Sequence, residues 1–122
     1  MHLECNTTSS FNCQGLPPTW NRSDEWYVFS NNPRTKGFSV LYTVDETMFN
    51  PSGNIPILVN DKDFGMGDDH PIVWYKCLPN GGRTFYSALG HDGAFFEEPL
   101  HLEMLKRAIL WAGKQEGDCN IK

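Results

Sequence analysis

The sequence predicts one α/β domain that is built from a single sheet and a C-terminal helix. Its 122 residues suit one domain, because domains cluster around about 100–150 residues. Three runs rich in β-branched and aromatic residues predict strands, at residues 37–44, 71–78 and 83–89. Residues 99–112 repeat apolar side chains at helical spacing, which predicts the helix. The aromatic share of 13% favours a folded chain over a disordered one.

The strand predicted at 37–44 follows a long region without a clear pattern. Residues 1–23 are rich in Ser, Thr, Asn and Pro and show no apolar period, which predicts a loop. The strand itself is apolar on both faces, as is typical of a buried central strand. One helix cannot cover both faces of a sheet. We therefore expect further cover from another chain, such as a second copy, or from a part of the domain outside this sequence.

The next two strands form a predicted hairpin. Residues 47–70 contain five Gly or Pro residues and predict an irregular connection, with a short extended piece at residues 57–59. Residues 79–82 (Pro-Asn-Gly-Gly) predict a turn between the strands at 71–78 and 83–89.

Residues 99–112 carry the signals of both helix ends. Pro99 suits a first helical turn, the acidic Glu97 and Glu98 favour the positive end of the helix dipole, and Gly113 suits the C-terminal end. We expect His101 to be exposed, like His2 near the N-terminus. The predicted buried stripe, at helical spacing, consists of Leu102, Leu105, Ile109 and Ala112, widened by Ala108 and Trp111.

Composition excludes two classes of partner. Ten basic and 15 acidic residues give a net charge of −5, which is the wrong sign for a nucleic-acid-binding protein. No apolar run approaches the roughly 20 residues of a membrane span. The N-terminus lacks the basic region and apolar stretch of a signal peptide. We expect either an intracellular protein or an export signal upstream of this sequence.

The four cysteines favour disulfide bonds. Cys5, Cys13, Cys77 and Cys119 fit no zinc pattern, because no Cys-x2-Cys pair exists. Their peripheral positions favour disulfides and a periplasmic or secreted location, with free thiols in the cytoplasm as the alternative. We expect Cys5 or Cys13 to pair with another cysteine, and one option is that they pair with each other.

Five short motifs stand in one order between residues 15 and 113. They are Asp24-Glu25-Trp26-Tyr27 with Asn32-Pro33-Arg34, Val40-Leu41 with Asp45-Glu46, residues 67–74 (GDDHPIVW), residues 82–91 (GRTFYSALGH) and residues 108–112 (AILWA). With these motifs the chain resembles the trehalose-utilisation (ThuA-like) family.

The resemblance implies a class I glutamine amidotransferase-like fold, which is flavodoxin-like. Such a fold has three layers, with a mostly parallel sheet between helices. Domains of the family are longer than this chain, so the resemblance implies that residues 15–113 are a C-terminal portion, ending in the hairpin and the helix. Residues 1–14 would then be a lead-in loop and residues 114–122 a tail or linker. The family is described as lacking the nucleophilic cysteine of amidotransferases.

The candidate catalytic residues are His91, Glu25 and Glu46. His91 follows a predicted strand, and ligands of open α/β sheets bind at the carboxyl ends of strands. A histidine beside a carboxylate can transfer protons at neutral pH. If the strands at 37–44 and 83–89 run parallel, His91 and Glu25 or Glu46 share one cleft, which Trp26 or Trp74 helps to line. The alternative is that His91 only hydrogen-bonds to loop backbone.

Carboxylates, a second histidine and aromatic rings could bind a substrate. Carboxylates grip sugar hydroxyls and aromatic rings stack on the apolar face of a sugar. The alternatives are caps or strand ends for the carboxylates, a strand-entry turn for the histidine, and core positions for the rings. The candidates are Asp24, Trp26, Tyr27, Asp45, His70 and Trp74.

The sequence predicts no metal site and no cofactor. The acid-rich stretch 61–70 is similar to a calcium loop, but Ile72 stands where the loop needs its bidentate glutamate. Two functions fit these residues. The first is an enzyme, or an enzyme remnant, of carbohydrate metabolism around trehalose and related disaccharides, as the resemblance implies. The second is a non-catalytic sugar-binding or interaction module of a larger secreted protein.

Overall fold

The computed structural model describes residues 1–5, 10–51 and 64–119. The extended piece predicted at 57–59, and Asp61 and Asp63 of the acid-rich stretch, lie outside these ranges. No helix of the described part is long and apolar enough to cross a membrane. The elements in chain order are β1 (His2–Leu3), η1 (Pro33–Lys36), β2 (Ser39–Thr43), η2 (Glu46–Met48), β3 (Pro71–Cys77), β4 (Arg83–Ser87), η3 (Gly93–Glu97) and α2 (Pro99–Ala112).

The chain has a mixed α/β fold with one sheet, whose strand order is β1-β2-β3-β4. Every pairing in this sheet is antiparallel, which differs from the mostly parallel sheet that the family resemblance implies. The short turn between β3 and β4 forces those two strands to run in opposite directions. Because β2 and β4 both run antiparallel to β3, they run parallel to each other. Their carboxyl ends therefore lie at the same edge of the sheet.

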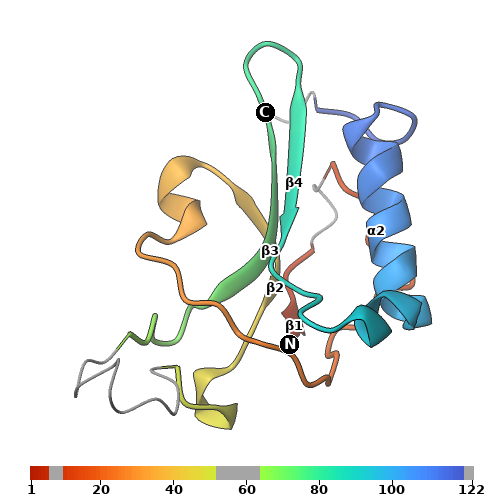
Figure 1. Cartoon of the computed structure of the whole chain (residues 1–122). Helices are drawn as coiled ribbons and strands as arrows, with labels where there is room; N and C mark the ends of the chain where they lie inside the picture. Colours follow the sequence, from red (N-terminus) through yellow and green to blue (C-terminus); the bar gives the residue numbers. More distant parts are fainter. Residues whose placement is uncertain (6–9, 52–63, 120–122) are drawn as a thin grey trace.

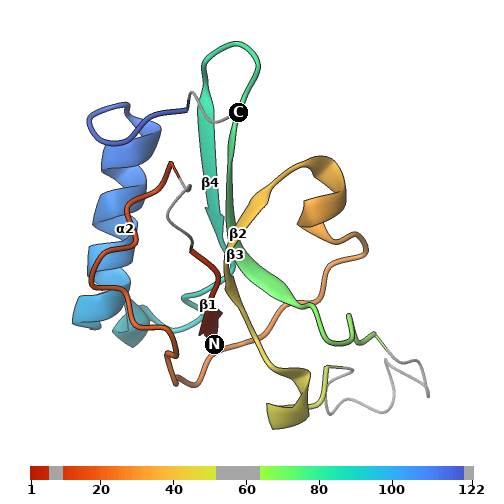
Figure 2. The ribbon, with the colours of Figure 1, turned by 180° about the vertical axis from the view of Figure 1, so that it is seen from behind.

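One face of the sheet packs against α2 and the N-terminal segment. Figures 1 and 2 show α2 and residues 10–20 on the same side of the sheet. Phe11 lies at the centre of this layer, with its ring 5.6 Å from Tyr75, 5.3 Å from Phe85 and 6.3 Å from Trp111. Residues 1–23, where the sequence predicted only a loop, contain β1, which pairs with β2. A strand of two residues is too short to produce a pattern that sequence reasoning can detect.

The opposite face is partly covered by the irregular segment between β1 and β2. Figure 1 shows residues 24–38, which include η1, on the side away from α2. On this face the ring of Phe29 lies 4.9 Å from that of Trp74. Val40 to Thr43 of β2 are all buried within the described chain, as predicted for a central strand. The chain's own irregular segment thus supplies part of the cover on this face.

α2 has the predicted bounds, but it is rotated relative to the predicted stripe. Leu102 is 47% exposed and Ile109 is 71% exposed, so the expected stripe is wrong at both positions. His101, which the sequence predicted to be exposed, is fully buried, and its Nδ1 lies 2.9 Å from the carbonyl oxygen of Phe95. Apolar spacing alone missed this polar anchor and so misplaced the face. The buried residues of the helix are His101, Met104, Ala108 and Trp111.

Two disulfides lie toward the two ends of the chain. Cys5 pairs with Cys13, as one of the predicted pairings has it, and Cys77 pairs with Cys119. The first bond closes the N-terminal loop beside Phe11, and the second ties the C-terminal tail to the end of β3. No cysteine is free, so the chain has no thiol that could act as a nucleophile.

Candidate functional site

The candidate site lies at the sheet edge where β2 and β4 end. Residues 21–29 run along this edge, and exposed and partly buried positions alternate from residue 21 to residue 28. Asp24 and Trp26 point toward the interior, whereas Glu25 and Tyr27 point outward. An extended chain places successive side chains on opposite sides, so this one segment contributes to two separate groups of residues.

The outward group consists of Glu25, Tyr27 and His91. Oε2 of Glu25 accepts a hydrogen bond of 2.8 Å from the hydroxyl of Tyr27 and lies 3.0 Å from Nδ1 of His91. The side chains of Glu25 and His91 are 49% and 55% exposed. The hydrogen bond to Glu25 raises the pKa of the Tyr27 phenol above its usual range. Tyr27 therefore stays protonated and donates to Glu25 at neutral pH.

Asp24 holds the backbone that carries His91. Its buried carboxylate accepts hydrogen bonds from the backbone N–H of Gly90 (2.9 Å) and of His91 (3.2 Å). The guanidinium of Arg22, also buried, lies 2.9 Å from the same carboxylate and 3.0 Å from that of Glu98. The buried Asp24 side chain thus links the loop after β4, which carries His91, to the segment that carries Glu25.

Gly90 is the residue that allows this turn. Its φ of +104° lies in the region that favours glycine, and an added Cβ would come within 2.6 Å of the Phe96 ring. Any other residue would have to move the ring and strain the backbone. We infer that the glycine is needed to bring the next residue, His91, back toward Glu25.

The inward group centres on His70 and Glu46. His70 is fully buried, and its Nδ1 lies 2.8 Å from Oε1 of Glu46 while its Nε2 lies 2.8 Å from the carbonyl oxygen of Tyr27. Glu46 also accepts from the backbone N–H of Met66 (2.5 Å) and of Gly67 (3.2 Å). Each ring nitrogen of His70 thus faces an oxygen atom of a different segment. His70 therefore joins the segment at residue 27 to η2.

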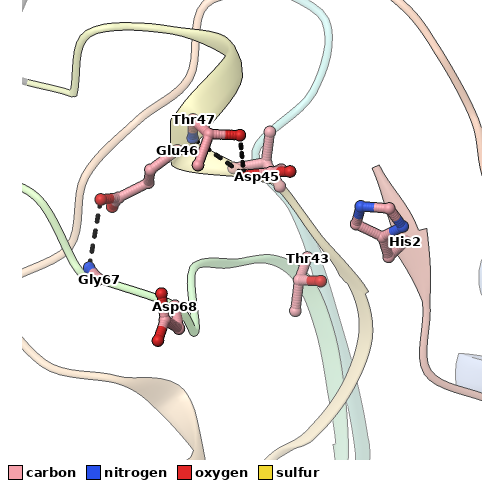
Figure 3. A pocket seen from close by; sticks show the side chains of 8 residues that line it. His2, Thr43, Asp45, Glu46, Thr47, Gly67 and Asp68 are labelled. Carbon is pink, nitrogen blue, oxygen red and sulfur yellow. Dashed lines mark hydrogen bonds between the residues drawn. The ribbon is translucent and has the colours of Figure 1, made fainter.

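Two pockets open beside this inward group. One has a volume of about 540 Å³ and is lined by polar residues, with Trp26 and Phe49 among its walls. The other has a volume of about 430 Å³ and is lined by Thr43, Asp45, Glu46, Gly67 and Asp68 with His2 on the far side (Figure 3). Asp45 lines both pockets. Its pKa is lowered by hydrogen bonds from Thr47, which makes it an acceptor for ligand hydroxyls at neutral pH.

Asp69, next to His70, makes an ion pair that depends on pH. Its carboxylate lies 2.8 Å from Nε of Arg34, which lowers the pKa of Asp69. Because the pKa of Asp69 is lower in the folded chain than in the unfolded chain, the ion pair stabilises the fold at pH values above about 4, the ordinary pKa of the carboxyl group. This stabilisation is lost as the pH falls through the lowered pKa. We expect Asp69→Asn to be less stable than the wild type at pH 6, with the difference shrinking below pH 4. Urea unfolding from pH 2.5 to 7 measures this, and a constant difference would contradict it.

The structure brings some predicted site residues together and separates others. His91 lies against Glu25, whereas Glu46 belongs to the buried His70 pair. Trp26 lines the larger pocket, and Trp74 lies on the outer face of the sheet. Sequence reasoning missed Arg22, which no motif at strand ends singled out. Its signal was its place two residues before Asp24, on the same side of an extended segment.

Comparison with known protein families shows which family this chain belongs to. The model of a family described as ThuA, trehalose utilisation, matches residues 1–112. The chain belongs to the ThuA family. The matched residues include all four strands and α2. No curated protein and no solved structure gives a significant match.

The ThuA family match covers all the candidate site residues, because each lies between residues 24 and 91. Within residues 1–5, 10–51 and 64–119, no group of three or more His, Cys, Asp or Glu side chains is arranged to hold a metal ion. The described residues of this ThuA chain present imidazole, carboxylate and phenol groups at the sheet edge.

Proposed function

We propose that this chain binds a disaccharide of the trehalose type at the edge where β2 and β4 end, and that His91 exchanges protons with it. The observation that carries the proposal is the exposed group of Glu25, Tyr27 and His91, held in place by buried Asp24. Membership of the ThuA family supports carbohydrate as the ligand. The net charge of −5 also favours a neutral ligand over a phosphorylated one.

The proposed chemistry is general acid–base catalysis. Nδ1 of His91 faces the Glu25 carboxylate, which favours a hydrogen on Nδ1 and leaves Nε2 as the base. Nε2 makes no hydrogen bond to any residue that the structure describes. A sugar hydroxyl at this nitrogen can give up its proton to it, and the Glu25 carboxylate stabilises the imidazolium that forms.

A second function is favoured by the two disulfides. Disulfides persist in oxidising compartments, which supports a periplasmic or secreted protein. His91 and Glu25 are open to water, as suits a non-catalytic sugar-binding module of a larger secreted protein. In that case Asp45, Glu46 and the larger pocket with Trp26 hold the sugar, and His91 only hydrogen-bonds to it. In both cases we place the sheet in the C-terminal part of a three-layer, amidotransferase-like domain.

The test is to titrate the chain with trehalose by calorimetry, and to incubate it with trehalose while NMR records new sugar signals. We expect His91→Ala to weaken binding by up to about tenfold, as for the loss of one hydrogen bond. Lys106→Ala, on the exposed side of α2, is the control and should bind like the wild type. New sugar signals that His91→Gln abolishes support the enzyme, and binding without turnover supports the module. Binding that survives His91→Ala unchanged contradicts a role for this histidine.

A further inference from the structure

An aromatic group on the outer face of the sheet stands apart from both pockets. Trp74 of β3 and Tyr86 of β4 are direct cross-strand neighbours, and their rings stack with centroids 4.5 Å apart and an interplanar angle of 22°. Phe29 contacts both rings edge-on, at 4.9 Å and 6.1 Å. These three side chains form what we call the aromatic plate. Two neighbours hold Tyr86 in one orientation, so it would lose little freedom on binding a ligand.

The Tyr86 ring is partly exposed. Trp74 stacks on one face of it, and because β4 is the last strand of the described sheet, no described strand stands on the other side. Tyr86 is 42% exposed, which is high for a ring that stacks on one neighbour and contacts a second. A flat, rigid and half-exposed ring is suited to stacking against another flat or apolar surface.

Polar groups surround the plate. The hydroxyl of Tyr86 and the indole N–H of Trp74 make no hydrogen bond within the described residues, and neither is a buried, unpaired atom. Both are therefore available to a ligand. A ring face with hydrogen-bonding groups at its rim matches a pyranose, which has apolar C–H groups on one face and hydroxyls around its edge.

The plate adjoins the Glu25 and His91 group through Tyr27. Tyr27 is 46% exposed and hydrogen-bonds to Glu25, and Phe29 of the plate stands two residues further along the same segment. Oε1 of Glu25 makes no hydrogen bond within the described residues, so it can accept one from a sugar hydroxyl. The chain thus offers a ligand the Tyr86 ring for stacking, the Glu25 carboxylate as an acceptor, and His91.

We propose that Tyr86, braced by Trp74 and Phe29, is a stacking subsite for a neutral pyranose ring, one sugar unit of the ligand whose other part reaches His91. The inference rests on the proposed function, because it assigns the second unit of the same disaccharide. The acidic chain and the carboxylate of Glu25 oppose an anionic ligand at this face.

The experiment measures trehalose binding by calorimetry and the ring signals of Tyr86 and His91 by NMR. Sorbitol, an acyclic polyol without an apolar ring face, is the control ligand. We expect Tyr86→Ala and Tyr86→Leu to weaken trehalose binding roughly five- to tenfold, and Tyr86→Phe to stay within about twofold of the wild type. Tyr86→Leu keeps an apolar side chain in the plate, so a loss of binding with an unchanged urea midpoint separates stacking from misfolding. Ile109→Ala, on α2 across the sheet, should bind like the wild type.

Three results would overturn the subsite. If Tyr86→Leu binds trehalose as tightly as the wild type while the sugar still shifts the His91 signals, the subsite is wrong and the proposed function stands. If trehalose shifts neither ring in the wild type, both are wrong. If the chain dimerises in solution and Tyr86→Ala dissociates the dimer, the plate is an interface between copies and not a sugar subsite.

Discussion

Replacing His70 by alanine should lower the free energy of unfolding by about 3–5 kcal/mol, because it leaves the mostly buried Glu46 carboxylate without its histidine partner. The change also removes the hydrogen bond to the carbonyl oxygen of Tyr27 and leaves a cavity. Urea unfolding at pH 7 measures the loss. His70→Gln keeps a hydrogen-bond donor and should lose less.

His91→Ala is the matched control for this prediction. It removes the same kind of pair, a histidine Nδ1 facing a glutamate Oε2 at 3.0 Å, but at a place where both side chains are about half exposed. Exposed pairs contribute little, so we expect a loss below about 1 kcal/mol. Equal losses in the two variants would show that burial does not distinguish the pairs, and that the structural role given to His70 is wrong.

Opening the Cys77–Cys119 bond should lower the free energy of unfolding by about 4 kcal/mol. The bond joins residues 42 apart, and a loop of that length gives about this loss from the chain entropy of the unfolded state. The bond also holds the tail against the end of α2, where Arg83 donates to the carbonyl oxygens of Trp111 and Glu116. The double variant Cys77→Ser/Cys119→Ser measures the effect by urea unfolding.

The Cys5→Ser/Cys13→Ser variant provides the comparison. That bond spans only 8 residues, and the same relation gives about 2.5 kcal/mol. Mass spectrometry under non-reducing conditions should find both bonds and no free thiol. Four free thiols, or a larger loss for the shorter loop than for the longer one, would contradict the assignment of the two disulfides.

The sequence predicted the parts of the fold that local patterns encode. The hairpin at 71–89 and the bounds of α2 follow from turn residues, β-branched runs and the proline at the helix start. The sequence also offered Glu25 or Glu46 as the partner of His91, but its strand-end argument concerned Glu46, which pairs with His70 instead. It could not predict which faces are buried, since His101 enters the core through a hydrogen bond to a backbone carbonyl. Apolar periodicity contains no information on such a contact.

Two further features depend on contacts between distant residues. The division between His91 with Glu25 and His70 with Glu46 depends on contacts between distant segments, and nothing in the spacing of the motifs fixes it. The antiparallel pairing of β2 with β3 likewise depends on a connection of more than twenty residues. In both cases the decisive partners are set by tertiary packing and not by local sequence.

The hydrogen bonds from Gly90 and His91 to Asp24 also bear on the order of folding. They join residues 66 and 67 positions apart, so the carboxylate can find its two donors only after the intervening chain has formed the sheet. Closing such a loop has an entropic cost that few local contacts offset beforehand. During synthesis Asp24 emerges long before its partners. The edge that carries His91 should therefore be among the last parts of the molecule to become native, and partly folded chains should have a complete helix α2 before they have a working site.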